Sequence, residues 1–286
     1  MKSAVSTCRD VVLSLLAAGV VATASGWTAH AAPTPDRVDE VPGRTALSFA
    51  HTPSGTRVGT ANHGEARPGL SIVKLYVADY MLRHGDGSPE DRALGQRMIR
   101  DSDDGAAAEA YAKYPQAIDA IAAEYRLTST HGAGFWGNAV TSTTDTVTFL
   151  EAKKSTDPDG EILGWMATAA PVAADGTHQN WGTGLLPSVI GTKWGWSDTG
   201  PSVVASASFG SDFSVAANTY GTVDEHTGDV LGAFAQDPAS PSPQPAQVPI
   251  RELIDRYNTM NDPRIDQLAG VIPSDWSLPA AVVPRP

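Results

Sequence analysis

Cysteine is almost absent from this 286-residue chain, which carries a single one, Cys8. Because Cys8 precedes an apolar stretch from Val11 to Val21, it lies in an N-terminal segment that we expect to be removed on export. The rest of the chain then has no thiol, which excludes disulfide scaffolds, thiolate metal sites and cysteine nucleophiles. The histidines show no metal-ligand spacing either, so the sequence predicts neither a metal nor another cofactor.

Long apolar runs are also missing. The stretch from Val11 to Val21 is shorter than the roughly 20 residues that span a bilayer. Lys2 and Arg9 precede it, and Ala29-His30-Ala31 follows as the small-x-small pattern that a signal peptidase cleaves. We therefore expect residues 1–31 to be a signal peptide and the mature protein to be secreted or cell-wall associated, without a stable membrane span. An uncleaved membrane anchor is the alternative.

Basic residues are scarce. The formal net charge is -12, and only five lysines follow residue 31. A negative balance repels phosphate backbones, and no basic cluster is present to override it. The sequence therefore argues against nucleic acid as a partner.

Several catalytic signatures are lacking. The chain has no G-x-S-x-G elbow and no H-E-x-x-H, which removes the signature of an α/β-hydrolase or a zincin. Residues Gly132 to Gly137 match G-x-G-x-x-G, but the segment before them is polar, and we interpret them as a glycine-rich surface loop. Asp157 to Glu161 lacks the glycine and glutamate spacing of a calcium loop and reads as an exposed turn.

The composition along the chain divides it into five segments. After the signal peptide, residues 32–44 read as a flexible leader. Residues 45–235 form the main domain, 236–249 a Pro-rich linker, and 250–286 a C-terminal helix and tail.

Within the main domain, strand patterns lie at both ends and helical patterns between them. The expected elements are a strand-turn-strand over 46–62, helices over 71–83, 89–100, up to 113, 115–124 and from 142, and strands over 189–196, 202–209 and 213–220. The last three are parted by tight turns and suggest an antiparallel meander. The order predicts an α+β fold in which helices flank an antiparallel β-sheet and a helical lobe is inserted between N-terminal and C-terminal strands.

One short motif pairs a hydroxyl with an amine. Ser71 and Lys74 open an expected helix, and residues three apart share one helix face. A buried lysine can lose its proton near neutral pH and act as a base towards a neighbouring hydroxyl. Alone, S-x-x-K is weak, and a helix cap beside a solvated lysine explains it equally well. Its order with Ser102-Asp103-Asp104 and Lys193-Trp194-Gly195 makes it more specific.

That triple order resembles the S-x-x-K, S-D-N and K-T-G elements of class A β-lactamases and penicillin-binding proteins, over roughly residues 45 to 220. The resemblance implies that Ser71 is the acylated nucleophile and Lys74 the general base. Ser102 would relay a proton to the leaving group, and Lys193 would hold positive charge over the site. The backbone N–H groups of Ser71 and Trp196 would form the oxyanion hole.

The same resemblance implies substrate contacts from Asp104, Trp194, Gly195 and Trp196. Two of these depart from the family pattern. Asp104 replaces an asparagine, so an amide that can donate becomes a carboxylate that accepts when ionised. Trp194 replaces a threonine or serine, whose hydroxyl would bind a substrate carboxylate.

These residues support a secreted serine hydrolase that transfers an acyl group from a cell-wall peptide, such as peptidoglycan, or from a related amide or ester. A non-catalytic wall-binding or scaffold protein with degenerate motifs is the rival, and a true β-lactamase is a weaker one. In class A β-lactamases a glutamate between the second and third motifs activates the deacylating water. Residues 127–145 contain no glutamate, so we expect any β-lactam acyl group to persist.

Overall fold

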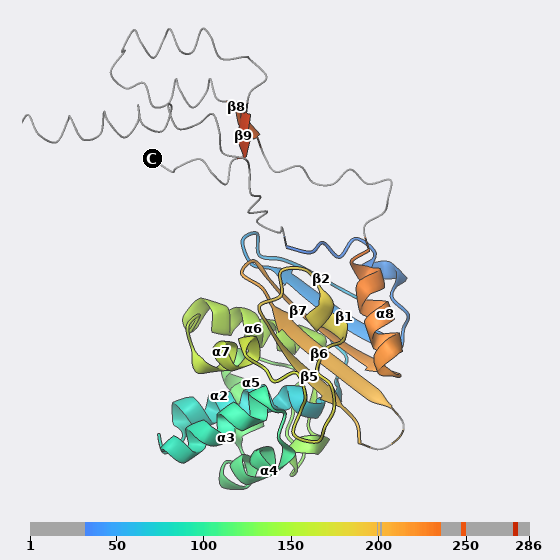
Figure 1. Ribbon diagram of the computed structural model, residues 1–286. Coiled ribbons are helices and arrows are strands. Elements are labelled where there is room, and N and C mark those ends of the chain that lie inside the picture. The colour runs from blue at the N-terminus through green and yellow to red at the C-terminus, as the bar shows by residue number, and fades with distance from the viewer. Residues whose placement is uncertain (1–31, 199, 201, 236–246, 250–276, 280–286) are drawn as a thin grey trace, which may run out of the picture. The chain divides into compact units, whose positions relative to one another are not determined.

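The computed structural model describes residues 32–198, 200, 202–235, 247–249 and 277–279 (Figure 1). The expected signal peptide and the expected helix over 250–260 lie outside these residues. The chain divides into two compact units after Ala235. In the second unit, β8 (Gln247–Pro249) and β9 (Ser277–Pro279) pair antiparallel, with Val248 opposite Leu278.

The first unit is built on a five-stranded antiparallel sheet in the order β2-β1-β7-β6-β5. The strands are β1 (Thr45–His51), β2 (Thr56–Gly59), β5 (Gly191–Trp196), β6 (Val203–Phe209) and β7 (Phe213–Tyr220). Every residue of β6 is buried, because helices cover both faces of the sheet. The N-terminal and C-terminal strands meet where β1 pairs with β7, which confirms the expected fold class.

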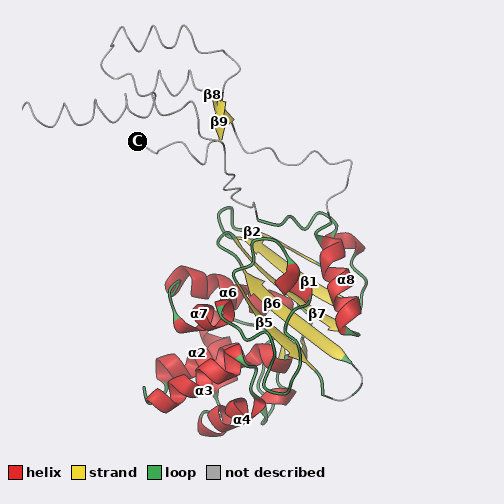
Figure 2. Ribbon diagram, in the orientation of Figure 1, coloured by secondary structure: helices red, strands yellow, loops and turns green. Residues whose placement is uncertain are grey.

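The helical lobe covers one face of the sheet, and α8 covers the other (Figure 2). The helices are α2 (Lys74–His84), α3 (Pro89–Arg100), α4 (Asp104–Lys113), α5 (Ala117–Tyr125), α6 (Thr143–Thr156), α7 (Glu161–Ala167) and α8 (Val223–Ala233). Four of them begin at side-chain caps, in which Ser88, Asp103, Ser142 and Thr222 accept a backbone N–H from the first turn. Short polar residues thus set the helix boundaries that the sequence suggested.

Two parts of the sequence interpretation were incomplete. Helices α7 and α8 were not expected from the sequence, although Thr222 and Glu225 form a capping box that marks the start of α8. The segment 32–44, expected to be a flexible leader, contains a 3-10 turn over Val38–Glu40, and the Arg37 N–H donates to the Ala233 carbonyl. Part of this segment is therefore packed on the domain.

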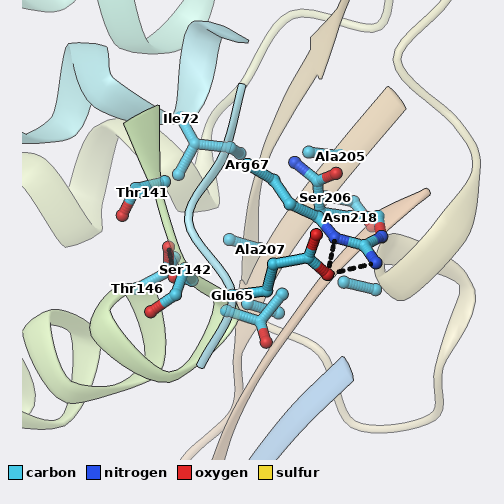
Figure 3. Close-up of a pocket in the computed structure, with 13 residues that line it drawn as sticks. Glu65, Arg67, Ile72, Thr141, Ser142, Thr146, Ala205, Ser206, Ala207 and Asn218 are labelled. Carbon is cyan, nitrogen blue, oxygen red and sulfur yellow. Dashed lines mark hydrogen bonds and ion pairs between the residues drawn. The ribbon is translucent and has the colours of Figure 1, made fainter. Parts of the chain in front are cut away.

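A buried arginine fixes the chain that leads to the first motif. The guanidinium of Arg67, on β3 (Arg67–Pro68), pairs with Glu65 at 2.8 Å and donates to the Asn218 carbonyl on β7 at 3.0 Å. Figure 3 shows this pair beside a cavity of only about 10 Å³, too small for a substrate. β3 also pairs with β4 (Val140–Thr141), so the residues before Ser71 are held from two sides.

Candidate active site

Ser71 lies on a 3-10 turn, η2 (Leu70–Val73), and α2 begins only at Lys74. The sequence had placed both residues on the first turn of one helix. The residue before the serine, Leu70, has a φ of +49°, an uncommon conformation for a non-glycine residue. The Ser71 side chain is 7% exposed, and among the described residues its hydroxyl has no hydrogen-bond partner. This hydroxyl is therefore available to an incoming group.

Lys74 is completely buried behind the serine. Its ammonium donates to the Ser102 carbonyl at 2.6 Å and to Asp104 Oδ1 at 2.5 Å, and lies 4.6 Å from the ring centroid of Trp136. Within the described chain no hydrogen bond joins Lys74 to Ser71. Burial lowers the pKa of Lys74, while the hydrogen bond and charge of Asp104 act in the opposite direction.

Ser102 connects the two lysines of the site. It lies between α3 and α4 with a φ of +51°, held by the cap that Asp103 makes at the start of α4. Its carbonyl accepts from Lys74, and its hydroxyl accepts from Lys193 Nζ at 2.8 Å. The first, second and third motifs are thus joined by hydrogen bonds through one serine.

Lys193 lies on β5 with no exposed surface. Besides Ser102 Oγ, its amine donates to the Trp194 carbonyl at 2.9 Å. Burial lowers the pKa of Lys193 well below its usual value, and the nearby Lys74 lowers it further. Lys193 therefore acts as an internal hydrogen-bond donor to Ser102 and to the Trp194 carbonyl.

β5 passes very close to the η2 turn at Gly195. A Cβ on Gly195 would lie 2.9 Å from both the Ser71 backbone nitrogen and Leu70 Cβ, so only glycine fits. Further along, Ser197 N–H donates to the Val203 carbonyl on β6. Because antiparallel N–H groups alternate in direction, the N–H of Trp196 points away from β6, off the outer edge of the sheet.

Trp194 does not reach the site, and its expected role in substrate binding was wrong. Its indole N–H donates to the Trp181 carbonyl at 2.9 Å, and the ring packs with Trp181 and Val204. Side chains alternate across a strand, so Trp194 points to the sheet face opposite that of Lys193 and Gly195. The same core cluster includes the partly buried Trp196.

The site opens into a cleft of about 560 Å³. Its lining residues are Pro68, Leu70, Ser71, Asp104, Ala108, Phe135, Trp136, Gly137, Asn138, Trp196, Ser197, Asp198, Gly200, Val203 and Tyr220. Phe135 and Trp136 come from the glycine-rich segment Gly132–Gly137, which was expected to be only a surface loop. Two bulky aromatics between glycines were the signal that could have identified this wall. Asp198 and Tyr220 were also missed.

The geometry brings together seven of the eight residues singled out in the sequence. Ser71, Asp104 and Trp196 line the cleft, Lys74, Ser102 and Lys193 form the hydrogen-bonded layer beneath, and Gly195 packs closely against the η2 turn. Trp194 is the exception. Among the described residues there is no group of three or more His, Cys, Asp or Glu side chains that could hold a metal ion, and no helix long and apolar enough to cross a membrane.

No protein-family model and no curated protein matches the chain. Solved structures do. A β-lactamase from Chitinophaga pinensis has a TM-score of 0.54 at 13% identity, covering 68% of this chain and 93% of its own. Penicillin-binding protein D2 from Listeria monocytogenes, in a cefotaxime-bound form, has a TM-score of 0.50 at 16% identity, covering 66% and 94%. A D-alanyl-D-alanine carboxypeptidase from Mycobacterium tuberculosis has a TM-score of 0.50 at 18% identity, covering 74% and 96%.

The first unit therefore has the fold of penicillin-binding proteins and β-lactamases. The low identity marks it as a divergent version of that fold. At this distance the likeness establishes architecture, and the chemistry has to be argued from the site itself.

Proposed function

We propose that the protein is a serine hydrolase that works through an acyl-Ser71 intermediate, on a cell-wall peptide or a related amide or ester. The observation that carries the proposal is the position of Ser71. Its hydroxyl has no partner among the described residues, lies at the wall of a 560 Å³ cleft, and is backed by a buried lysine three residues later. The three solved neighbours bear the names of a β-lactamase, a penicillin-binding protein and a carboxypeptidase, which supports acyl transfer as the reaction class.

In the proposed reaction the Ser71 hydroxyl attacks the acyl carbonyl and passes its proton to neutral Lys74. The bond to the leaving oxygen or nitrogen then breaks, and the leaving group takes a proton through Ser102, which accepts a hydrogen bond from Lys193. Water attacks the acyl-serine, releasing the acid and restoring the hydroxyl. Lys74 must first give up its hydrogen bond to Asp104 and turn towards Ser71.

The oxyanion that forms during attack needs two preorganised donors. The N–H of Ser71 and the outward N–H of Trp196 are the candidates, since Gly195 lets β5 approach the nucleophile turn. Loss of one such donor typically costs about 3 kcal/mol of transition-state stabilisation. The close packing of Gly195 on the η2 turn thus supports a role for the Trp196 backbone N–H, at the edge of β5, as an oxyanion donor.

One feature favours the rival function, a non-catalytic wall-binding protein. The 2.5 Å contact between Lys74 and Asp104 favours a charged lysine, and a charged lysine cannot accept a proton. Burial acts against it, and burial is the larger influence on this pKa. We therefore place catalysis first, and we propose export of the protein on the signal-peptide pattern of residues 1–31.

Intact-mass measurement after incubation with a neutral alkyl fluorophosphonate tests the proposal. One added phosphonyl group, located by peptide mapping on Ser71 and absent from Ser71→Ala, is the expected result. The exposed Ser211 on the β6–β7 turn provides the matched control, because Ser211→Ala should label as the unaltered chain does. A chain that takes up no label under conditions where the fold is intact would favour the wall-binding alternative.

A further inference from the structure

The charged residues that line the cleft all have one sign. Asp104 has a side chain 57% exposed, and Asp198 is exposed at the end of β5. Among the described residues of the lining there is no lysine, arginine or histidine. The whole chain carries a formal charge of -12, so its field attracts cations and repels anions.

Lys74, Lys193 and Arg67 are turned inward or already paired. Lys74 donates to the Ser102 carbonyl and Asp104, and Lys193 to Ser102 Oγ and the Trp194 carbonyl. Arg67 lies 4.6 Å from the ring centroid of Tyr220, but it is 2% exposed and ion-paired with Glu65. Among the described residues of the lining, a substrate carboxylate would meet no cation but two carboxylates, Asp104 and Asp198.

Aromatic rings supply the remaining walls. Phe135 is 49% exposed and Tyr220 is 42% exposed, and both line the cleft with Trp136. The Phe135 and Trp136 rings are tilted together with centroids 5.4 Å apart. Aromatic faces attract ammonium groups within about 6 Å of the ring centroid. The Lys74 amine lies 4.6 Å from the Trp136 ring centroid, which is within this range.

We propose that the cleft selects acyl esters or amides that carry an ammonium group and disfavours those that carry a carboxylate. The inference rests on the proposed acyl-serine function, because the serine fixes where the acyl carbonyl must lie. Ser71 is nine-tenths buried, and its hydroxyl has no partner among the described residues. The acyl carbonyl of a substrate must lie next to this hydroxyl, in the cleft that Asp104 also lines.

Such a substrate would also prepare the base. An ammonium group beside Asp104 competes for the carboxylate that holds Lys74. Losing that hydrogen bond, and gaining a nearby positive charge, both favour the neutral amine that can take the Ser71 proton. The cation would thus act in binding and in activation at one residue.

Three acetyl thioesters of matched size test the selectivity at low ionic strength. Their leaving groups are thiocholine, its uncharged 3,3-dimethylbutyl isostere, and 3-mercaptopropionate. The expected order of kcat/KM is cation, then neutral, then anion, with about tenfold or more between the first and the last. Asp198→Asn should reduce the ratio of the cationic to the neutral thioester. Asp212→Asn removes the same charge from the exposed β6–β7 turn and should leave the ratio unchanged.

Binding separates failure of the inference from failure of the proposed function. Choline, 3,3-dimethylbutanol and propionate are titrated into Ser71→Ala while tryptophan fluorescence is followed, since Trp136 and Trp196 line the cleft. Choline alone should saturate at low millimolar concentration. If the chain binds choline but no serine is labelled by the fluorophosphonate, the proposed hydrolase function is overturned and the charge selectivity of the cleft is kept. Labelling of Ser71 with equal or reversed preference among the three thioesters would overturn the selectivity and keep the hydrolase.

Discussion

Lys74 Nζ lies 2.5 Å from Asp104 Oδ1, so the buried amine three residues after Ser71 is held by a carboxylate at the cleft wall. The Asp104 side chain is 57% exposed and that of Lys74 is not exposed at all. The pair therefore links the buried layer of the site to the space where a ligand would bind, and it controls how readily Lys74 loses its proton.

Asp104→Asn should make acylation by a neutral fluorophosphonate faster at pH 7. The carboxylate raises the pKa of Lys74 against the larger, lowering effect of burial, so its removal lets the pKa fall. Lys74 can accept a proton only in its neutral form, so the acylation rate should rise with pH through the pKa of Lys74. In Asp104→Asn this rise should occur at lower pH than in the unaltered chain. Rates measured from pH 5 to 10 check this. A curve that does not move would show that Lys74 is not the base.

Ser71→Ala should abolish phosphonylation, and replacement of Lys74 should slow it strongly without unfolding the chain. A positioned base contributes typically about 10²- to 10⁴-fold. Lys74→Met keeps much of the buried volume, whereas Lys74→Ala adds a cavity, so the two together separate chemistry from packing. Labelling rates and thermal unfolding are measured on all three variants. Full-rate labelling in Ser71→Ala would reject the assignment.

Gly195→Ala should lower the acylation rate by about 10²-fold, the size expected when an oxyanion donor is misplaced. The new Cβ would lie 2.9 Å from Ser71 N and Leu70 Cβ, so β5 and the nucleophile turn must separate. Gly228→Ala is the matched control. It lies inside α8 with nothing within 4 Å of its Cβ position, so it should stabilise the helix and leave labelling unchanged. Equal rates in both variants would remove β5 from the mechanism.

Stability should fall by about 3 kcal/mol as the pH is lowered from 6.5 to 4, because of His226. Its ring is completely buried between Ser206 and Thr219, with 2.7 Å contacts from both nitrogens. Burial lowers the pKa of His226 to about 4, from 6.5 in the unfolded chain, while Asp229 opposes the shift. Since the folded state resists protonation, its advantage is complete above pH 6.5 and is lost below it.

Urea unfolding at several pH values, followed by tryptophan fluorescence, measures this dependence. His226→Gln removes the titrating ring, so its unfolding free energy should change much less between pH 6.5 and 4. For Asp229, burial raises the pKa, but hydrogen bonds from Arg44 and Thr45 outweigh it and lower the pKa overall. Protonation of Asp229 therefore destabilises the folded protein only at a pH lower than the range in which His226 titrates. The same slope in the variant and the unaltered chain would assign the effect to other groups.

The sequence was informative wherever a local rule set the structure. Ser88, Asp103 and Ser142 are short polar caps that can be recognised from residue type alone, and they start helices as expected. The order of the three motifs also predicted that Ser71 and Lys193 belong to one site, and η2 and β5, which carry them, lie side by side. The order of motifs shared with a known family predicts which distant residues lie together, whereas hydrophobic periodicity predicts only local helices and strands.

Other features depended on tertiary context. Every residue of β5 from Gly191 to Gly195 is buried, so the hydrophobic pattern cannot tell which face Trp194 occupies. The hydrogen bond that turns Lys74 towards Asp104 depends on the αL conformation of Ser102, which the sequence does not reveal. The sequence did not indicate that Phe135 and Trp136 line the cleft, because a glycine-rich loop has no hydrophobic periodicity that predicts where its side chains point.

Finally, any acyl group that a penicillin places on Ser71 should be long-lived, so the protein would be trapped by penicillins and give little protection against them. Residues 127–145 hold no glutamate, and their single carboxylate, Asp145, is 4% exposed and accepts from Ser129 N and Thr130 Oγ1, both at 2.8 Å. A carboxylate engaged in this way is poorly placed to activate water. Because a penicillin carries a carboxylate, its acylation should also be slow. Intact mass followed over hours after removal of free penicillin measures the lifetime. Rapid multiple-turnover hydrolysis of a chromogenic cephalosporin, lost in Ser71→Ala, would overturn the prediction and favour a β-lactamase.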